Sequence, residues 1–367
     1  MPARAGRARA VGAGRQPGRG RGTGPGRPVV GRRPVRRARQ PGRRGRPGRC
    51  PVTAPARVAA IDCGTNSLRL LVADVDPGQR TLTDVVRRME IVRLGQGVDA
   101  TGRIAAGALA RTLRVLAEYA DIVQAAGARS VRMVATSATR DAANAGEFTR
   151  GVTGVLGTGP EVITGEEEAY LSFTGATAEL PPGTAAPCLV ADIGGGSTEF
   201  VLGQAGVVTA AASVDIGCVR MTERHLRGDP PDPAQVAAAR ADIDAALDQV
   251  AARVPVTQAR TLVGLAGSVT TVAALALGLP RYDPERIHHS RIPAREVHHQ
   301  AEKLLRQTHA ERAALSVMHP GRVDVIAGGA MVLDRIMTRY GCSEVVASEH
   351  DILDGIAWSL AEGLAAS

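Results

Sequence analysis

Two acidic residues flank a run of three glycines near the middle of this chain. Asp192 precedes Gly194-Gly195-Gly196-Ser197 and Glu199 follows it, with apolar runs entering and leaving. Glycine allows positive φ and close approach to a ligand, and converging backbone N–H groups form a nest that binds phosphate-like anions. Carboxylates on adjoining hairpin strands could hold a divalent cation beside that anion. A plain hairpin needs only one Gly-containing dipeptide, so we favour a phosphate loop over a plain turn.

A similar turn occurs earlier in the chain. The apolar run Val58–Ile61 leads into it, an apolar run resumes at Leu68, and the turn itself contains Asp62, Gly64, Thr65, Asn66 and Ser67. Recurrence of the same strand–turn–strand order about 130 residues apart indicates an internal repeat. Two domains of similar fold, each supplying one loop, could clamp a phosphate chain from both sides.

Arg140 follows the apolar run Val131–Ala135 and the small polar residues after it. A position between a strand end and a helix start often faces the ligand in α/β folds, where a guanidinium could bind two phosphate oxygens. An arginine on the surface of a helix fits this spacing equally well.

Three consecutive acids, Glu166, Glu167 and Glu168, open a predicted helix. Acids in a first turn suit the helix dipole. Acids close to a bound polyanion would repel it, however, unless one of them has a chemical task. Activation of a water for attack on phosphorus is such a task for an ionised carboxylate.

Other segments give weaker signals. Gly264–Thr271 is a strand, Gly-rich turn and helix start that could contact a ligand or simply allow close packing at Gly267. We expect the pairs His288-His289 and His298-His299 to face solvent. Ser348 and Asp351 predict a capping box at the start of a last helix at 350–364, with Asp351 as the acid at position N3. Apolar periodicity predicts a strand at 81–94 and helices at 104–126 and 233–254.

The 367 residues carry a net charge of +9, but this charge is unevenly distributed. The first 50 residues contain 16 arginines and no acid, which leaves −7 for the remainder, and Lys303 is the only lysine. Residues 1–55 have no apolar periodicity to offset the entropy of ordering. This segment could be a basic arm or a disordered tail. We slightly favour a third interpretation, a misassigned start with translation beginning at Val52.

Several functional classes are disfavoured. No apolar run is long enough to span a bilayer, and five scattered cysteines without a CxxC pair predict reduced, mostly buried thiols in a cytoplasmic protein. GxxxxGK[ST], GxSxG and strand-linked GxGxxG motifs do not occur. Aromatics at 2% provide no stacking platform for single-stranded nucleic acid. We therefore expect no membrane partner and no specific nucleic-acid partner.

Four motifs together resemble the exopolyphosphatase/guanosine pentaphosphate phosphohydrolase (Ppx/GppA) family, within the actin–sugar kinase–Hsp70 superfamily. They occur in order as Asp62-x-Gly64-Thr65-Asn66-Ser67, Ala135-Thr136-Ser137-Ala138-Thr139-Arg140, Thr164-Gly165-x-Glu167-Glu168-Ala169 and Asp192-Ile193-Gly194-Gly195-Gly196-Ser197-Thr198-Glu199. Gly217-x-x-Arg220 and the segments near residues 264–271 and 327–355 extend the resemblance to about residues 57–364. Leu353-Asp354-Gly355 departs from the Arg-Glu-Gly common in the family.

The resemblance implies an α/β fold with two ribonuclease-H-like domains and a cleft between them. The implied divisions are a tail at 1–55, an N-terminal domain at 56–182 and a C-terminal domain at 183–367. By the family's pattern Glu168 would be the base that deprotonates water, and Arg140 would bind the terminal phosphate. Asp192 and Glu199 would hold Mg²⁺, with Mn²⁺ as an alternative. The two loops, Gly64–Ser67 and Gly194–Ser197, would donate backbone N–H groups to the phosphate.

The function implied is Mg²⁺-dependent release of terminal phosphate from inorganic polyphosphate. Hydrolysis of guanosine pentaphosphate is the close alternative and would require a base-binding pocket near Gly264–Thr271. A non-catalytic polyphosphate or alarmone sensor is the alternative from another class, which retention of Glu168 disfavours. We expect a homodimer, and basic patches of arginine along the cleft of the acidic body.

Overall fold

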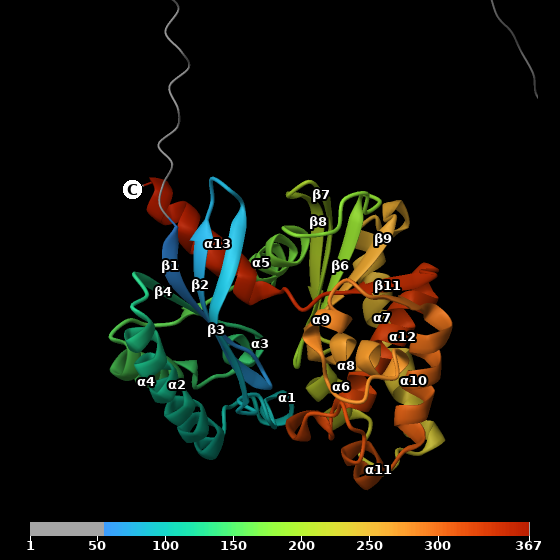
Figure 1. Cartoon of the computed structure of the whole chain (residues 1–367). Coiled ribbons are helices and arrows are strands. Elements are labelled where there is room, and N and C mark those ends of the chain that lie inside the picture. Colours follow the sequence, from blue (N-terminus) through green and yellow to red (C-terminus); the bar gives the residue numbers. More distant parts are fainter. Residues whose placement is uncertain (1–54, 367) are drawn as a thin grey trace, which may run out of the picture. The chain divides into compact units, whose positions relative to one another are not determined.

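The computed structural model describes residues 55–366, which contain two β-sheets and the helices that cover them (Figure 1). The predicted tail at 1–55 therefore lies, except for its last residue, outside the described residues.

The first sheet has the strand order β3-β2-β1-β4-β5. β1 and β2 form the first predicted strand–turn–strand unit, and β1 also pairs in parallel with β4. The strand expected at 81–94 is β3, which ends three residues earlier, at Ile91. The strands are β1 (Ala56–Cys63), β2 (Ser67–Asp76), β3 (Thr81–Ile91), β4 (Ser130–Ala135) and β5 (Glu161–Val162).

The second sheet repeats this topology. Its order β10-β11-β9-β6-β7-β8, read from β8, matches the first sheet with one further edge strand. β6 pairs antiparallel with β7 and parallel with β9, as β1 does with β2 and β4. The predicted internal repeat is thus confirmed. The strands are β6 (Cys188–Ile193), β7 (Thr198–Gln204), β8 (Val207–Val214), β9 (Thr261–Leu265), β10 (Arg291–Pro293) and β11 (Glu344–Ala347).

The helices before the second sheet follow the apolar periodicity. In the long helix predicted at 104–126, Val115, Leu116, Tyr119 and Val123 turn one face toward the core of the first sheet. Such spacing places the side chains on one stripe of the helix. The helices are α1 (Val98–Thr101), α2 (Ala106–Ala126), α3 (Ser137–Asp141), α4 (Ala145–Leu156) and α5 (Gly165–Thr177).

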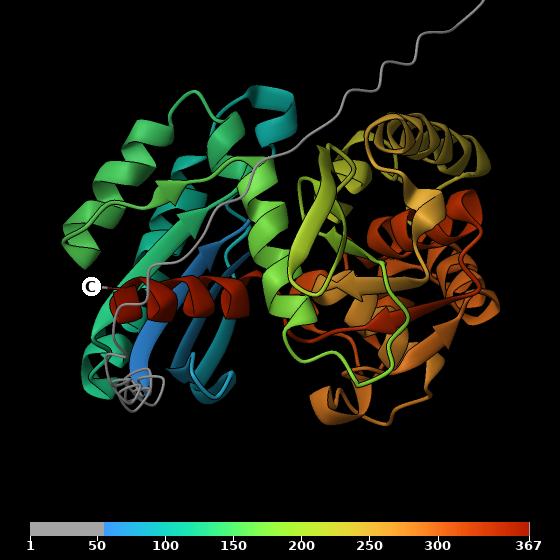
Figure 2. The same cartoon turned by 90° about the horizontal axis from the view of Figure 1, so that it is seen from above.

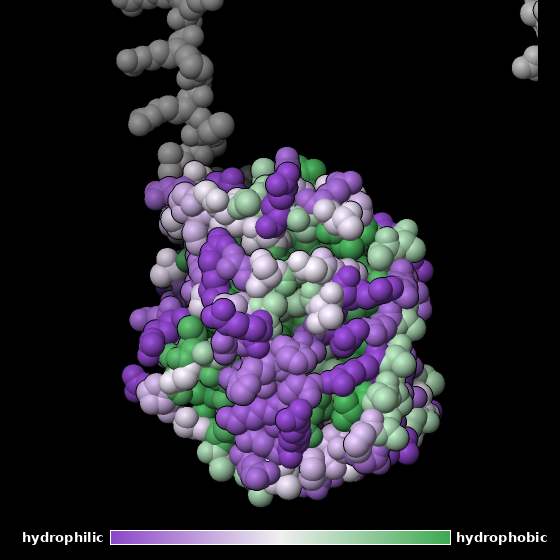
Figure 3. All heavy atoms as spheres, turned by 90° about the vertical axis from the view of Figure 1, so that its right-hand side faces the viewer, coloured by the Kyte–Doolittle hydropathy of each residue, from purple (hydrophilic) through white to green (hydrophobic). Residues whose placement is uncertain are grey.

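The second sheet carries a larger helical layer. Asp232 caps α7 by accepting from the Gln235 amide, and ion pairs join Asp244 to Arg335 and Asp248 to Arg339 between α7 and α12. Figure 3 shows this side of the molecule with hydrophilic bands between smaller apolar areas. The helices are α6 (Cys218–Arg224), α7 (Pro233–Arg253), α8 (Ala266–Ala276), α9 (Pro284–Ile287), α10 (Ala294–Arg306), α11 (His309–Ala313) and α12 (Ile326–Tyr340), with short 3₁₀ turns at Val256–Gln258 and Pro320–Arg322.

The last helix, α13 (Ile352–Ala366), returns to the first sheet (Figure 2). Its apolar side chains share a core with β1 and β2, and it also packs on α5. The expected capping box is wrong in register because the helix starts later than predicted. Asp351 lies before the helix and accepts from the Leu353 amide, while Asp354 accepts from the Asp351 amide.

Two sequence-wide expectations can be compared with the described residues. None of their helices is long and apolar enough to cross a membrane. Cys63, Cys188 and Cys218 are buried free thiols and Cys342 is a partly buried one, as predicted; Cys50 lies outside the described part of the chain.

Candidate active site

The two glycine turns meet at the carboxyl ends of β1 and β6. The Gly64 amide donates to the Ser67 carbonyl at 3.0 Å within the first turn. A Cβ placed on Gly195 would lie 2.9 Å from the Cβ of Thr65. Because the strands that carry them occupy equivalent positions in the two sheets, the repeated sequence brings its two polar turns together.

The glycines of the second turn serve close packing. We expected positive φ in this turn, but Gly194, Gly195 and Gly196 are not among the residues in that region. A Cβ on Gly196 would lie 2.4 Å from the Ser137 hydroxyl, and Gly217 packs on the backbone of Gly195. The expected left-handed backbone is therefore wrong; a side chain is excluded here by neighbours on three segments.

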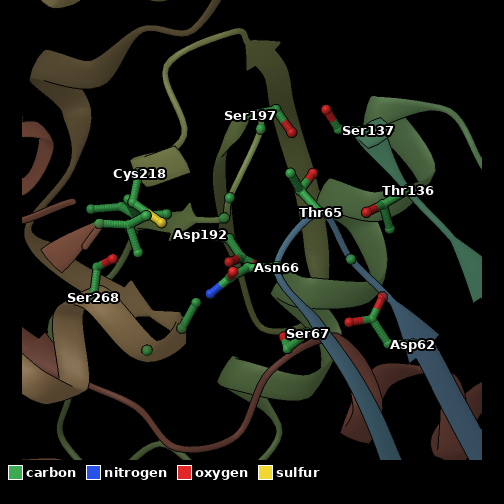
Figure 4. Close-up of a pocket in the computed structure, with 18 of the residues that line it drawn as sticks. Asp62, Thr65, Asn66, Ser67, Thr136, Ser137, Asp192, Ser197, Cys218 and Ser268 are labelled. Carbon is green, nitrogen blue, oxygen red and sulfur yellow. The ribbon is translucent and has the colours of Figure 1, made fainter. Parts of the chain in front are cut away.

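A cavity of about 90 Å³ lies between the turns. Figure 4 shows Thr65, Asn66 and Ser67 from the first turn around it, with Asp192 and Ser197 from the second. All eight predicted loop residues line it. Other parts of the wall come from Thr136 and Ser137 at the start of α3, Glu168 of α5, Cys218 of α6, and the segment 266–268, among further residues.

Four buried carboxylates gather at this cavity: Asp62, Glu168, Asp192 and Glu199. Asp192 and Glu199 are direct partners across the β6–β7 hairpin, so their side chains lie on one face of the sheet. Ser172 donates to Asp192 at 2.6 Å and Ser213 donates to Glu199 at 2.7 Å. Glu199 stands behind the cavity rather than in its lining.

Burial and neighbouring negative charges raise the pKa of all four acids. Burial, followed by the negative charge of Asp351, raises the pKa of Asp192 to about 6. Burial, followed by the charge of Asp192, raises the pKa of Glu199 to about 7. Burial is also the main cause that raises the pKa of Asp62 and of Glu168. A cation or arginine close to the cluster would favour the ionised forms.

Only the third acid of the Glu166–Glu168 run points inward. Glu166 and Glu167 are exposed, and Glu167 pairs with Arg132. Glu168 is 8% exposed and lines the same cavity as the glycine turns. Helix-dipole stabilisation is a sufficient reason for the first two acids, but it does not explain a carboxylate buried beside three others.

Arg140 lies behind Glu168. Its guanidinium donates to Glu168 Oε2 at 3.1 Å and to the Ile163 carbonyl at 2.9 Å, and it is absent from the cavity lining. This ion pair lowers the pKa of Glu168, against the larger effect of burial. The contact with a terminal phosphate stays a prediction.

Comparisons with known proteins show the family of this chain. Residues 71–362 match the model of the Ppx/GppA phosphatase family. The chain belongs to this family. Exopolyphosphatase 2 of Mycobacterium tuberculosis is 52% identical over 320 residues, which are 84% of this chain and 99% of that protein.

Two further comparisons extend the finding. A crystal structure described as an exopolyphosphatase-like protein superposes with a TM-score of 0.82 at 42% identity, covering 85% of this chain and 99% of that one. Guanosine-5'-triphosphate,3'-diphosphate pyrophosphatase of Vibrio cholerae is 36% identical over 170 residues, which are 46% of this chain and 33% of that protein. The resemblance read from the motifs and the α/β fold with two similar domains are confirmed.

Sequence reasoning missed Arg69 in this Ppx/GppA chain. It lies in β2, lines the cavity, donates to Asp62 Oδ2 at 2.6 Å and pairs with Asp351. Asp351 follows Arg69 by 282 positions. The residues around Arg69 resemble those around other arginines in strands. Its position two residues after the first turn could have indicated that it lies close to the site.

Arg322 was missed for the same reason. It lines the cavity from the turn before α12 and donates to the Gly267 carbonyl at 3.3 Å. A Cβ on Gly267 would lie 2.0 Å from the guanidinium carbon of Arg322, so the close packing expected at Gly267 is packing against this arginine. Arg69 and Arg322 supply positive charge within an acidic body.

The donor set fits a divalent cation that also binds substrate. Within residues 55–366, no three His, Cys, Asp or Glu side chains form a group that could by itself hold a metal ion. Mg²⁺ commonly uses one or two carboxylates and completes its shell with water and phosphate oxygens. Asp62 Oδ1 is buried without a hydrogen-bond partner among the described residues, and the charge of Asp62 helps to raise the pKa of Glu168 and of Asp192. The residues present therefore suit such an ion.

A second cavity of about 440 Å³ adjoins the first and shares Arg69, Ala266, Gly267 and Arg322 with it. Tyr282 donates to Glu349 at 2.6 Å, and both line this cavity with Thr270. His288 and His289, predicted to face solvent, are instead partly buried nearby, stacked on each other and on His350. The second pair, His298-His299, is exposed as expected.

Proposed function

We propose that this chain is a divalent-metal-dependent exopolyphosphatase that releases terminal orthophosphate from inorganic polyphosphate. One observation carries the proposal. A buried carboxylate, Glu168, faces two glycine turns whose backbone can bind phosphate, with Asp192 in the same small cavity. The 52% identity to a full-length exopolyphosphatase supports the substrate.

In the proposed reaction the terminal phosphate lies between Gly64–Ser67 and Gly194–Ser197. Glu168 accepts a proton from a water, whose oxygen attacks the terminal phosphorus, and the shortened polyphosphate leaves. The raised pKa of Glu168 makes it a stronger base than an exposed glutamate once it is ionised. Its contact with Arg140 fixes the orientation of the carboxylate.

The cation in this proposal is Mg²⁺, with Mn²⁺ as an alternative. Asp192 and Glu199 would hold it. Asp62 Oδ1, which has no hydrogen-bond partner among the described residues, would be a further ligand. When bound, it neutralises charge on the phosphate oxygens. Positioning and charge neutralisation provide most of the rate enhancement in phosphoryl transfer, and Arg69 and Arg322 contribute to both from the walls of the cavity.

Hydrolysis of guanosine pentaphosphate is the second candidate, and the larger cavity favours it. That cavity borders Ala266, Gly267 and Thr270, where a nucleotide substrate requires a pocket for its base. Tyr282 and Glu349 offer an aromatic ring and a hydrogen-bonding carboxylate there. The identity to the Vibrio cholerae pyrophosphatase points in the same direction.

The decisive experiment measures phosphate release with Mg²⁺ from short polyphosphate, long polyphosphate and guanosine pentaphosphate in parallel. Release from polyphosphate is expected and defines the chain-length range. Release from the nucleotide alone would replace the first proposal by the second. Tight binding without release from any substrate would indicate a sensor.

The homodimer and the cytoplasmic location stay predictions. Sedimentation of the purified chain and fractionation of the native host would test them.

A further inference from the structure

The carbonyl groups of the glycine turn all point toward helix α6. The Gly196 carbonyl accepts from the Gly217 amide at 3.1 Å, the Gly194 carbonyl from Cys218 at 2.9 Å, and the Gly195 carbonyl from Val219 at 2.9 Å. In a trans peptide the C=O and N–H groups point in opposite directions. The N–H groups of Gly195, Gly196 and Ser197 therefore point away from α6, and these three residues line the cavity.

Arg220 extends this arrangement with its side chain. Its Nε donates to the Gly196 carbonyl at 2.8 Å, beside the bond from Gly217. One terminal nitrogen donates to Asp99 at 2.8 Å, and the other to Asp141 at 2.5 Å and Ser137 at 3.4 Å. The side chain is 11% exposed and each of its three nitrogens donates to at least one of these partners, so the protein itself fixes the position of the guanidinium.

The partners of Arg220 come from the ends of both sheets. Gly196 is in the second turn, whereas Ser137 begins α3, directly after β4 of the first sheet. Asp99 and Asp141 hold the guanidinium from the same side as Ser137. Loss of Arg220 would remove one of the two hydrogen bonds that the Gly196 carbonyl accepts. It would also remove the cation paired with Asp141, whereas Asp99 keeps its pair with Arg224.

We propose that Arg220 is a positioning residue, which orients the Gly196–Ser197 peptide so that the Ser197 N–H faces the bound phosphate. This inference rests on the proposed phosphatase function of the same cavity. It assigns a role to a side chain that does not reach the cavity itself.

Arg224 provides a matched control. It lies one turn later on α6 and pairs with the same Asp99, at 2.7 Å, and with Asp242. It has no hydrogen bond to the glycine turn or to Ser137 among the described contacts. Arg220→Met and Arg224→Met therefore both remove ion pairs to Asp99, but only the first removes the bond to Gly196.

The test compares kcat, KM and Tm of the two variants, together with amide hydrogen exchange of the peptide spanning 194–200 in the free protein. We expect both variants to lower Tm, and only Arg220→Met to lower kcat, by about 100-fold, which is the effect typical for loss of one aligned hydrogen-bond donor in an active site. The 194–200 peptide should exchange faster only in Arg220→Met. Arg220→Lys should recover Tm without recovering kcat, because one ammonium cannot reach Gly196 and both carboxylates together.

Equal kcat values in the two methionine variants, or unchanged exchange at 194–200, would overturn the positioning role. If the wild-type protein releases phosphate from no substrate, the proposed function fails instead. The exchange comparison still decides the role of Arg220 in that case, since it needs no substrate.

Discussion

Glu168 differs from its two acidic neighbours in burial rather than in chemistry. It is 8% exposed beside Asp62, Asp192 and Glu199, whereas Glu166 and Glu167 face solvent. Burial raises the pKa of Glu168 well above its usual range, and the charges of the other carboxylates add to this effect. At the residue scale, the candidate base is therefore selected by its surroundings.

Replacement of Glu168 by Gln should lower phosphate release by about 10²–10⁴-fold, the range typical for loss of a general base. Substrate binding should survive, because an amide keeps the shape of the side chain and removes negative charge. Phosphate release and calorimetric binding on the same preparation provide the measurement. Glu167→Gln, which changes an exposed neighbour, should keep the wild-type rate of phosphate release. If both variants lost the same share of that rate, the proposed role of Glu168 as the base would be wrong.

Asp192 should govern the metal dependence. Chelation with EDTA is expected to abolish phosphate release by the wild-type protein and added Mg²⁺ to restore it. Asp192→Asn should raise the Mg²⁺ concentration for half-maximal release, because a neutral amide binds a hard cation more weakly. Asp74→Asn, which alters a surface pair with Arg57, is the control. An unchanged Mg²⁺ response in Asp192→Asn would place the ion elsewhere.

At the scale of elements, the site depends on a close crossing between α5 and α13. A Cβ on Gly355 would lie 2.0 Å from the Leu171 carbonyl oxygen, and one on Gly175 would lie 1.9 Å from that of Asp351. Backbone atoms cannot move aside as a flexible side chain can. The crossing positions both Glu168, on α5, and Asp351, which pairs with Arg69 in the cavity wall.

Gly355→Ala should therefore destabilise the protein by about 1–3 kcal/mol or more, the usual cost of overpacking. Denaturant unfolding at equilibrium measures this change. Gly154→Ala in α4, where a Cβ meets no atom within 4 Å, should instead raise stability slightly because Gly is a weak helix former. A Gly355→Ala protein as stable as wild type would show that the helices can separate at low cost.

At the scale of the whole molecule, tertiary structure assembles a histidine cluster from distant segments. His288 stacks on His289 with ring centroids 3.6 Å apart and on His350 at 4.5 Å. Its Nδ1 accepts from the Glu349 amide, which requires an unprotonated nitrogen there. Burial, followed by the charges of His289, His350 and Arg87, lowers the pKa of His288 to about 3.

This cluster predicts a loss of stability in mild acid. Between pH 6.5 and about 3, His288 is protonated in the unfolded chain but stays neutral in the folded protein. The contribution of neutral His288 to the free energy of unfolding is therefore complete above pH 6.5 and declines as the pH falls through this window. His288→Asn keeps an acceptor for the Glu349 amide and should narrow the difference in Tm between pH 7 and pH 5. His299→Asn, at an exposed position, should leave the profile unchanged. A His288→Asn profile identical to wild type would contradict the assignment.

The features that could be predicted from the amino-acid sequence are those that are local in the chain. Glycine spacing, flanking acids and apolar runs predicted both strand–turn–strand units, because the change from an apolar strand to a polar, glycine-containing turn lies within a few consecutive residues. The repeat predicted two similar sheets, and the four motifs together identified the family.

The contacts between polar groups from distant segments depend on the folded chain. Arg69 joins Asp351 from 282 residues away, and Arg322 packs on Gly267 from another segment. Packing also turned Glu168 inward and Glu167 outward, and replaced the expected left-handed turn by glycines crowded against Thr65 and Ser137. Burial and electrostatic interactions depend on neighbours in space, so no local pattern could specify them.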